Sequence, residues 1–159
     1  MNVRRSIADF LVRDDGASAV EFSIVLAPFV FLLLGLVQMG VYYYAQISLD
    51  TGVLKTAEYL NTDFRSGSGT PTLPDAATLK NYVQTYGGAF SNSSNVSVEI
   101  RQITSLTSGL VAIVDGTVDY GGTTSILALR GQANLSIFAP MLGSLATVRS
   151  SALVRRQGR

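Results

Sequence analysis

The chain has 159 residues, of which 47% are hydrophobic and 14% are charged, and its 12 basic and 11 acidic side chains leave a formal net charge of +1. Soluble domains carry about 25% charged residues, so the composition favours contact with lipid, and the small net charge argues against nucleic acid as a partner. The sequence contains no His and no Cys. It therefore cannot build a His/Cys zinc site, a Cys nucleophile, a Ser-His-Asp triad or an iron–sulfur cluster.

A short polar leader occupies residues 1–16, with three arginines against three aspartates. The positive-inside rule counts Lys and Arg near a span rather than net charge. Beyond the apolar run that follows, the nearest basic residues are Lys55 and Arg65. The leader has more basic residues near the run than the segment after it, and this small excess predicts a cytoplasmic amino terminus.

An apolar run without any charged residue covers residues 22–46. About 20 apolar residues cross a hydrocarbon core of roughly 30 Å, so the run predicts a transmembrane helix over about residues 22–45. A buried core helix is the weaker alternative. A cleavable secretory signal also fits poorly, because the small residues 17–19 precede the run rather than follow it. Pro28 lies inside the run and predicts a kink.

Polar and aromatic side chains mark the second half of the run. Gln38 is the one amide there before Gln46, and it either bonds to another helix or is simply tolerated. The tyrosines at 42–44 fit an aromatic belt at the far membrane interface.

Helical spacing of apolar residues continues past the run, which predicts one helix over residues 17–60. Residues 61–74, rich in Gly, Ser, Thr and Pro, predict a loop. The remainder, residues 75–159, predicts a small domain outside the membrane.

This domain begins with an amphipathic pattern that predicts a short helix over residues 75–90, started by Asp75. Alternation and β-branched residues then predict strands. The four segments are 96–103, 110–120, 132–138 and 146–155. Asp115-Gly116 either splits the second segment into a hairpin or marks a bulge. The predicted fold is α+β: a long N-terminal transmembrane helix continuing into a small C-terminal domain, with three or four antiparallel strands packed against it.

The junction between leader and span has a distinctive order of residues: Gly16-Ala-Ser-Ala-Val-Glu21-Phe22, directly followed by the apolar run. This order resembles the class III signal of type IV pilin-like proteins. Over residues 16–60 the chain resembles more closely the TadE-like family, minor pseudopilins of the tight-adherence (Tad) pilus.

The resemblance implies specific roles at this junction. A prepilin peptidase would cleave between Gly16 and Ala17, and glycine suits the position before the cut because it lacks a Cβ. Glu21 would then pair with the new amino group of a neighbouring subunit during assembly, and Phe22 would belong to the same assembly element. The structural alternatives are a helix-start glycine, a juxtamembrane carboxylate in water and an interfacial aromatic anchor.

The resemblance further implies partners and a location. The partners would be the prepilin peptidase, other pilins and pseudopilins, the Tad inner-membrane platform and the lipid bilayer, with no nucleic acid. The protein would cross the bacterial inner membrane once, with its domain outside, and would act as a structural or priming subunit in pilus assembly and surface adhesion. The alternative is an uncleaved single-span protein that acts as an envelope assembly factor or sensor.

The residues predict no enzyme. Asp115 and Asp119 read as turn and strand-surface residues, and no nucleophile with a base stands out. The sequence predicts no metal site, since no EF-hand spacing is present, and no cofactor. The basic carboxyl end, residues 149–159, is predicted to be a strand and tail exposed to solvent. The weaker alternative is that it docks to a partner or to anionic lipid.

Overall fold

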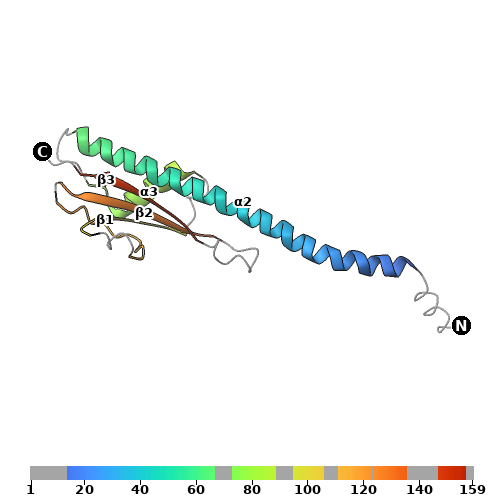
Figure 1. The fold of residues 1–159 in the computed structure, drawn as a ribbon. Coiled ribbons are helices and arrows are strands. Elements are labelled where there is room, and N and C mark those ends of the chain that lie inside the picture. Colours follow the sequence, from blue (N-terminus) through green and yellow to red (C-terminus); the bar gives the residue numbers. More distant parts are fainter. Residues whose placement is uncertain are drawn as a thin grey trace.

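A long helix carries a small domain along its C-terminal half (Figure 1). This computed structural model describes residues 14–66, 73–88, 95–105, 111–122, 124–135 and 147–156. In chain order the elements are α2 (Asp14–Ser66), α3 (Ala76–Gly87), β1 (Val96–Gln102), β2 (Ile126–Asn134) and β3 (Thr147–Arg155). The predicted class, a long apolar N-terminal helix followed by an α+β domain with an antiparallel sheet, is confirmed. Residues 1–13 of the predicted leader lie outside the described residues.

Helix α2 continues without interruption over 53 residues. It runs past residue 60, where the turn-rich composition predicted a loop, because a tertiary contact holds its last turns. The side chain of Asn61 accepts a hydrogen bond from the backbone N–H of Arg155 at 3.0 Å. Local composition contains no information about that contact.

Helix α3 begins at Ala76 with Asp75 as its N-cap, the residue from which the sequence predicts the helix to start. The Asp75 carboxylate accepts a hydrogen bond from the N–H of Thr78 at 2.8 Å, which caps one of the free donors of the first turn. The helix ends at Gly87, before Gly88 with its φ of 77°. A positive φ strains a residue that has a Cβ, whereas glycine adopts it freely, so Gly88 lets the chain leave the helix here.

The three strands form an antiparallel sheet in the order β1-β2-β3. Two predicted segments, 96–103 and 146–155, coincide with β1 and β3. The predicted segment 132–138 overlaps the central strand, Ile126–Asn134, at residues 132–134 and misses its first six residues, while residues 136–138 lie outside the described residues. Arg130 and Gly131 of this strand disturb the apolar alternation, so the pattern concealed most of the strand, which the neighbouring strands stabilise from both sides.

Residues 111–120, the described part of the predicted segment 110–120, are not a strand of the sheet, contrary to the sequence prediction. The part from Gly116 to Asp119 lies along the free edge of β1 and forms a single parallel bridge, between Ile100 and Val118. The N–H of Gly116 donates to Val98 O at 3.0 Å, and the N–H of Ile100 donates to Thr117 O at 2.9 Å. Asp115-Gly116 is therefore neither a hairpin nor a bulge. It is the turn that brings this covering segment onto the edge.

The core lies between the sheet and the two helices. One face of α2 enters it at a spacing of four residues, with Ala45, Leu49, Val53 and Ala57 all buried. Helix and sheet approach closely at Gly131 of β2, where an added Cβ would lie 2.9 Å from Val53 Cγ2. The outer half of α2 is thereby anchored to the domain.

Candidate functional site

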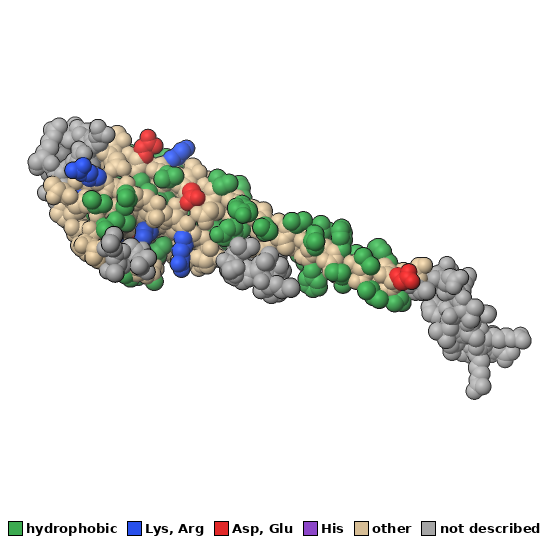
Figure 2. All heavy atoms as spheres, in the orientation of Figure 1, with side chains coloured by type: hydrophobic (Ala, Val, Ile, Leu, Met, Phe, Trp, Pro, Cys, Tyr) green, Lys and Arg blue, Asp and Glu red, His purple; other side chains and the backbone are tan. Residues whose placement is uncertain are grey.

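Among the described residues, the N-terminal part of α2 is distinguished by the exposure of its side chains. From residue 18 to residue 37 every side chain is exposed except Gly35, which is intermediate. Figure 2 shows hydrophobic side chains covering this half of the helix, whereas charged side chains gather on the domain. At a rise of about 1.5 Å per residue, this segment is roughly 30 Å long, the thickness of a hydrocarbon core. We call it the exposed segment.

The exposed segment belongs to a helix, Ser18–Asp63, that is long and apolar enough to cross a membrane, one such helix in the part of the chain that is described. An apolar surface of this size is unfavourable in water, since each Å² costs about 25 cal/mol. The helix therefore fits a single-pass membrane protein.

The predicted assembly residues lie at the start of this segment. Gly16 and Ala17 are in the first turn of α2, which begins at Asp14. Glu21 lies one helical turn after Ala17 and is exposed, and the described residues contain no ion-pair partner for it. Phe22 is 65% exposed. The structure thus brings the four predicted residues together on one helix end, and their roles stay predictions.

Pro28 lies in the middle of the exposed segment, and α2 continues through it. A proline has no N–H, so the carbonyl of Ile24 loses its helical donor. The hydroxyl of Ser23 donates to Ala19 O at 2.7 Å, a local bond that also tends to bend helices. Thr51, Thr56 and Thr62 make the same kind of bond in the second half of α2, so Pro28 is what distinguishes the backbone bonding of the exposed segment.

Gln38 marks the end of the exposed segment. The sequence left open whether this amide bonds to another helix or is merely tolerated. In the structure Gln38 is completely buried within its own chain. Tyr42 packs against the domain core, and its ring lies 5.7 Å from that of the exposed Tyr43. The part of the apolar run after residue 37 therefore belongs to the folded domain as much as to the membrane.

Comparison with known proteins identifies this helix. Residues 16–58 match the sequence model described as TadE-like protein. This segment is TadE-like. The predicted resemblance is confirmed over these residues, and the match starts at Gly16, the residue that the junction pattern singled out. No curated protein and no solved structure matches the chain.

The TadE-like match indicates a Tad pilus-associated protein with pilin-like partners. It covers the exposed segment and most of the helix that the domain packs on, but it ends before α3. The family is a structural one that is not known for enzymatic activity. The domain beyond residue 58 must accordingly be interpreted from its own side chains.

A buried ion pair lies on the outer face of the sheet, the face turned away from α2. Glu99 of β1 is fully buried and pairs with Arg130 of β2, whose Nε donates to Glu99 Oε1 at 2.6 Å. The N–H of Val114 donates to the other carboxylate oxygen at 2.7 Å. Sequence analysis missed this pair, although a charged residue inside each of two apolar strands is the pattern that could have indicated it.

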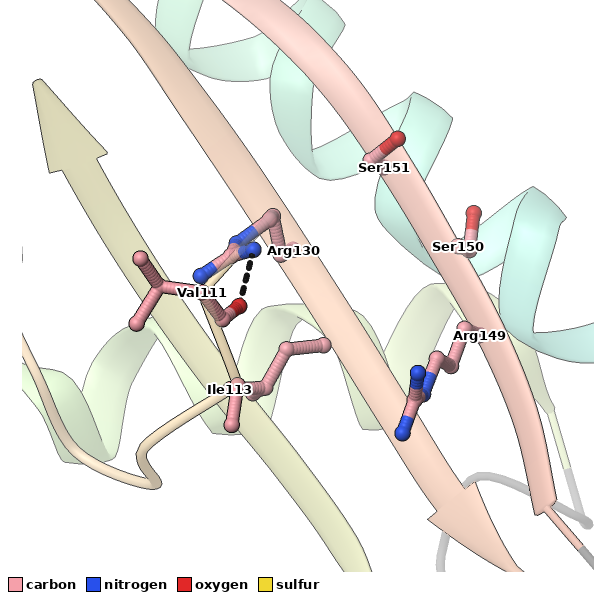
Figure 3. Close-up of a pocket in the computed structure, with 7 residues that line it drawn as sticks. Val111, Ile113, Arg130, Arg149, Ser150 and Ser151 are labelled. Carbon is pink, nitrogen blue, oxygen red and sulfur yellow. Dashed lines mark hydrogen bonds between the residues drawn. The ribbon is translucent and has the colours of Figure 1, made fainter. Parts of the chain in front are cut away.

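A shallow pocket of about 430 Å³ adjoins this ion pair (Figure 3). We call it the outer-face pocket. Its lining consists of Val111, Ala112, Ile113, Arg130, Arg149, Ser150 and Ser151. Arg130 donates from Nη1 to Val111 O at 2.7 Å, while Arg149 extends away from that contact. The pocket therefore combines an apolar wall from the loop with a polar, cationic wall from β3.

The carboxylates that sequence analysis considered have structural partners. Asp115 accepts hydrogen bonds from the N–H of Val98 at 2.9 Å and from Lys80 at 3.0 Å. Asp119 accepts one from the N–H of Gly121 at 3.0 Å. Among the described residues no group of three or more Asp or Glu side chains could hold a metal ion.

Proposed function

We propose that the chain is a minor pseudopilin, made as a prepilin and cleaved between Gly16 and Ala17 by a prepilin peptidase. The mature protein is held in the bacterial inner membrane by the exposed segment, with its amino terminus cytoplasmic and its domain outside. It is a structural or priming subunit of Tad pilus assembly and so contributes to surface adhesion. The observation that carries the proposal is the TadE-like match that starts at Gly16.

The length of the exposed segment supports the membrane placement. Residues 18–37 equal the hydrocarbon thickness, and the first fully buried side chain, Gln38, follows at once. The domain then stands directly on the membrane surface, where it can meet other subunits that are held at the same depth.

The chemistry of Glu21 supports a role in assembly. Cleavage converts Ala17 into a positively charged amino terminus at neutral pH. Within one subunit this amine is a helical turn from Glu21, and in a neighbouring subunit it can approach Glu21 across the helix interface. At a membrane boundary a lone carboxylate is costly, so pairing with an amine relieves a penalty on both groups.

Cleavage at this position requires α2 to open locally. Gly16 and Ala17 lie close to the described start of this helix, and helix ends open more easily than helix centres. Glycine before the cut allows the extended backbone to approach a peptidase closely.

The direct test is the intact mass and amino-terminal sequence of the protein purified from its native membrane. A mature chain that begins at Ala17 is the expected result, and a Gly16→Leu variant should keep its leader. A wild-type chain that keeps residues 1–16 in cells with an active prepilin peptidase would instead establish an uncleaved single-span envelope protein.

The role of Glu21 is tested separately with Glu21→Gln. We expect the variant to be inserted and cleaved normally but to lose pilus assembly, measured as pili per cell and surface attachment. Lys55→Gln is the control, because Lys55 is an exposed charged side chain of the same helix outside the exposed segment. Normal pili in Glu21→Gln cells would refute the pairing with a neighbour's amine.

A further inference from the structure

Strand β3 has a free edge that is blocked at both ends but open between them. The N–H of Arg156 donates to Ser125 O, so the even-numbered residues of β3 face β2 and the odd-numbered ones direct their backbone groups away from it. Gln46 of α2 donates to Arg149 O at 2.9 Å, and Asn61 of α2 accepts from Arg155 N at 3.0 Å. These two side chains cap the ends of the edge.

Between the two caps, the backbone N–H and C=O groups of Ser151 and Leu153 point outward. In the described part of the chain no group bonds to them. An exposed row of unpaired backbone groups is a template for another strand, and proteins usually cover or charge such edges. Here the other outer edge, that of β1, is covered by the segment 116–119, whereas among the described residues no group bonds to the middle of the β3 edge.

A hollow lies on each side of this open edge, and Ser151 lines both of them. On the outer face is the outer-face pocket. On the helix side is a second hollow of about 620 Å³, which we call the helix-side groove. The groove is lined by Leu54, Ala57, Glu58, Asn61, Thr62, Ser151, Ala152 and Leu153.

The two hollows differ in chemical character. In the outer-face pocket, Arg130 is neutralised by the buried Glu99. Arg149 donates from Nε to Gln132 Oε1 at 3.0 Å, which orients its guanidinium, and no carboxylate in the described regions pairs with it. The pocket therefore presents one uncompensated positive charge.

The helix-side groove presents apolar surface and one negative charge. Leu54 is 58% exposed in this groove, whereas the 66% exposed side chain of Leu153 lies on the outer face with Arg149, because residues two apart in a strand share a face. Large apolar side chains exposed next to unpaired backbone groups are typical of a protein interface. Glu58 at the same groove would repel an acidic side chain.

We propose that the open edge of β3 binds an extended segment of a partner protein in which acidic and apolar residues alternate. The partner's backbone pairs with Ser151 and Leu153. Since successive side chains of a strand point to opposite faces, its acidic side chains fall on the Arg149 side and its apolar ones enter the helix-side groove. The caps at Gln46 and Asn61 limit the paired stretch to a few residues.

This inference goes beyond the proposed pseudopilin function and does not depend on cleavage at Gly16 or on Glu21. It assigns a recognition role to the domain beyond the TadE-like segment, where β3 and its basic side chains are found.

The test uses the full chain in lipid nanodiscs at neutral pH and three fluorescein-labelled hexapeptides with blocked ends. The first alternates acid and apolar residues (Glu-Val-Glu-Val-Glu-Val), the second has lysine in place of glutamate, and the third has the first peptide's composition without alternation (Glu-Glu-Glu-Val-Val-Val). Fluorescence anisotropy should show binding of the first and at least roughly tenfold weaker binding of the other two. Equal binding of the first peptide and either of the others would overturn the proposal.

A charge reversal locates the site. Arg149→Glu should weaken binding of the acidic alternating peptide by roughly tenfold and should create binding of the lysine peptide. Misfolding of Arg149→Glu could explain weaker binding of the acidic peptide, but it could not explain new binding of the lysine peptide. Arg101→Glu is the matched control, because Arg101 points to the same sheet face from β1, at the opposite edge, and should change neither affinity. An unchanged affinity in Arg149→Glu would refute the assignment.

The backbone contribution is tested with Ser151→Pro. Proline at this position removes an N–H that points away from β2, so the sheet keeps its own ladder, and edge positions are where strands accept proline. The variant should fold and should lose peptide binding. If it does not fold, a peptide with N-methyl groups on alternate residues supplies the same test, and full binding of both N-methyl patterns would overturn the proposal.

A second copy of the chain is the competing occupant of the edge. In nanodiscs that hold two subunits, it would appear as a concentration-dependent dimer, and Ser151→Pro would dissociate this dimer. Peptide binding would weaken as the protein concentration rises. That result would overturn the assignment to a partner segment.

Discussion

Arg130 and Glu99 face each other across the outer side of β1 and β2, and the carboxylate is fully shielded from water. The pair is completed by the backbone, because Val114 N–H donates to Glu99 and Val111 O accepts from Arg130. The loop at 111–114 is thus held on the sheet by two buried charges. This loop forms one wall of the outer-face pocket.

Arg130→Met should therefore destabilise the domain strongly. The substitution leaves Glu99 buried without its cation, which costs about 3–5 kcal/mol in comparable cases. Chemical denaturation in detergent, followed by far-UV circular dichroism, measures the loss. Arg149→Met is the control, since Arg149 is exposed and its loss should change the free energy of unfolding by no more than about 0.5 kcal/mol.

Asp115 should make the domain sensitive to acid. Burial works to raise the pKa of Asp115, but the hydrogen bonds from Val98 N–H and Lys80 outweigh it and hold this pKa below the ordinary value of 3.8. A lowered pKa in the folded state stabilises the protein above the unfolded value, and this contribution is lost as the pH falls through 3.8 toward the folded pKa.

The measurement is the free energy of unfolding at about pH 5 and about pH 3, for wild type and Asp115→Asn. The wild type should lose more stability between the two values than the variant does. Equal losses in both proteins would show that other carboxylates account for the acid sensitivity.

Gly52 permits the close contact between α2 and α3. A Cβ at this position would lie 2.5 Å from the carbonyl oxygen of Val83, a backbone atom that cannot turn aside. Gly52→Ala should therefore cost about 1–3 kcal/mol in spite of alanine's better helix propensity. Gly40 of the same helix has open space around its missing Cβ. Gly40→Ala should consequently leave stability unchanged or raise it, in the same denaturation experiment.

Membrane depth can be measured with single cysteines, because the chain has none of its own. A cysteine in place of Leu32, in the exposed segment, should not react with a membrane-impermeant maleimide in sealed vesicles. A cysteine in place of Ile47, which is 66% exposed beyond Gln38, should react from the side that carries the domain. Detergent should make Leu32→Cys reactive, and reaction without detergent would contradict the membrane placement.

Much of the fold was predictable because it depends on local sequence. The capping Asp75 and the alternation in β1 and β3 act over a few residues, and a single chain shows them directly. Most of the central strand β2 was missed because Arg130 and Gly131 interrupt its alternation. Both residues are explained by tertiary contacts, since Arg130 forms an ion pair with Glu99 and Gly131 leaves space for the side chain of Val53.

The TadE-like segment was predictable for a different reason. Gly16, Glu21 and the apolar run are adjacent in the chain, so their order alone identified the TadE-like segment. The outer-face pocket and the open edge of β3 could not be predicted, because their residues come from segments separated by dozens of positions.

By itself, the sequence determined that this protein has one membrane-length helix with a pilin-like junction, because hydrophobic length and residue order are properties of a continuous stretch. Tertiary structure alone decided that Gln38 is buried, that residues 116–119 cover the edge of β1, and that Gln46 and Asn61 cap the edge of β3. The physical reason is that burial and hydrogen-bond pairing depend on which distant segments meet. They meet where α2, α3 and the sheet together remove apolar surface from water.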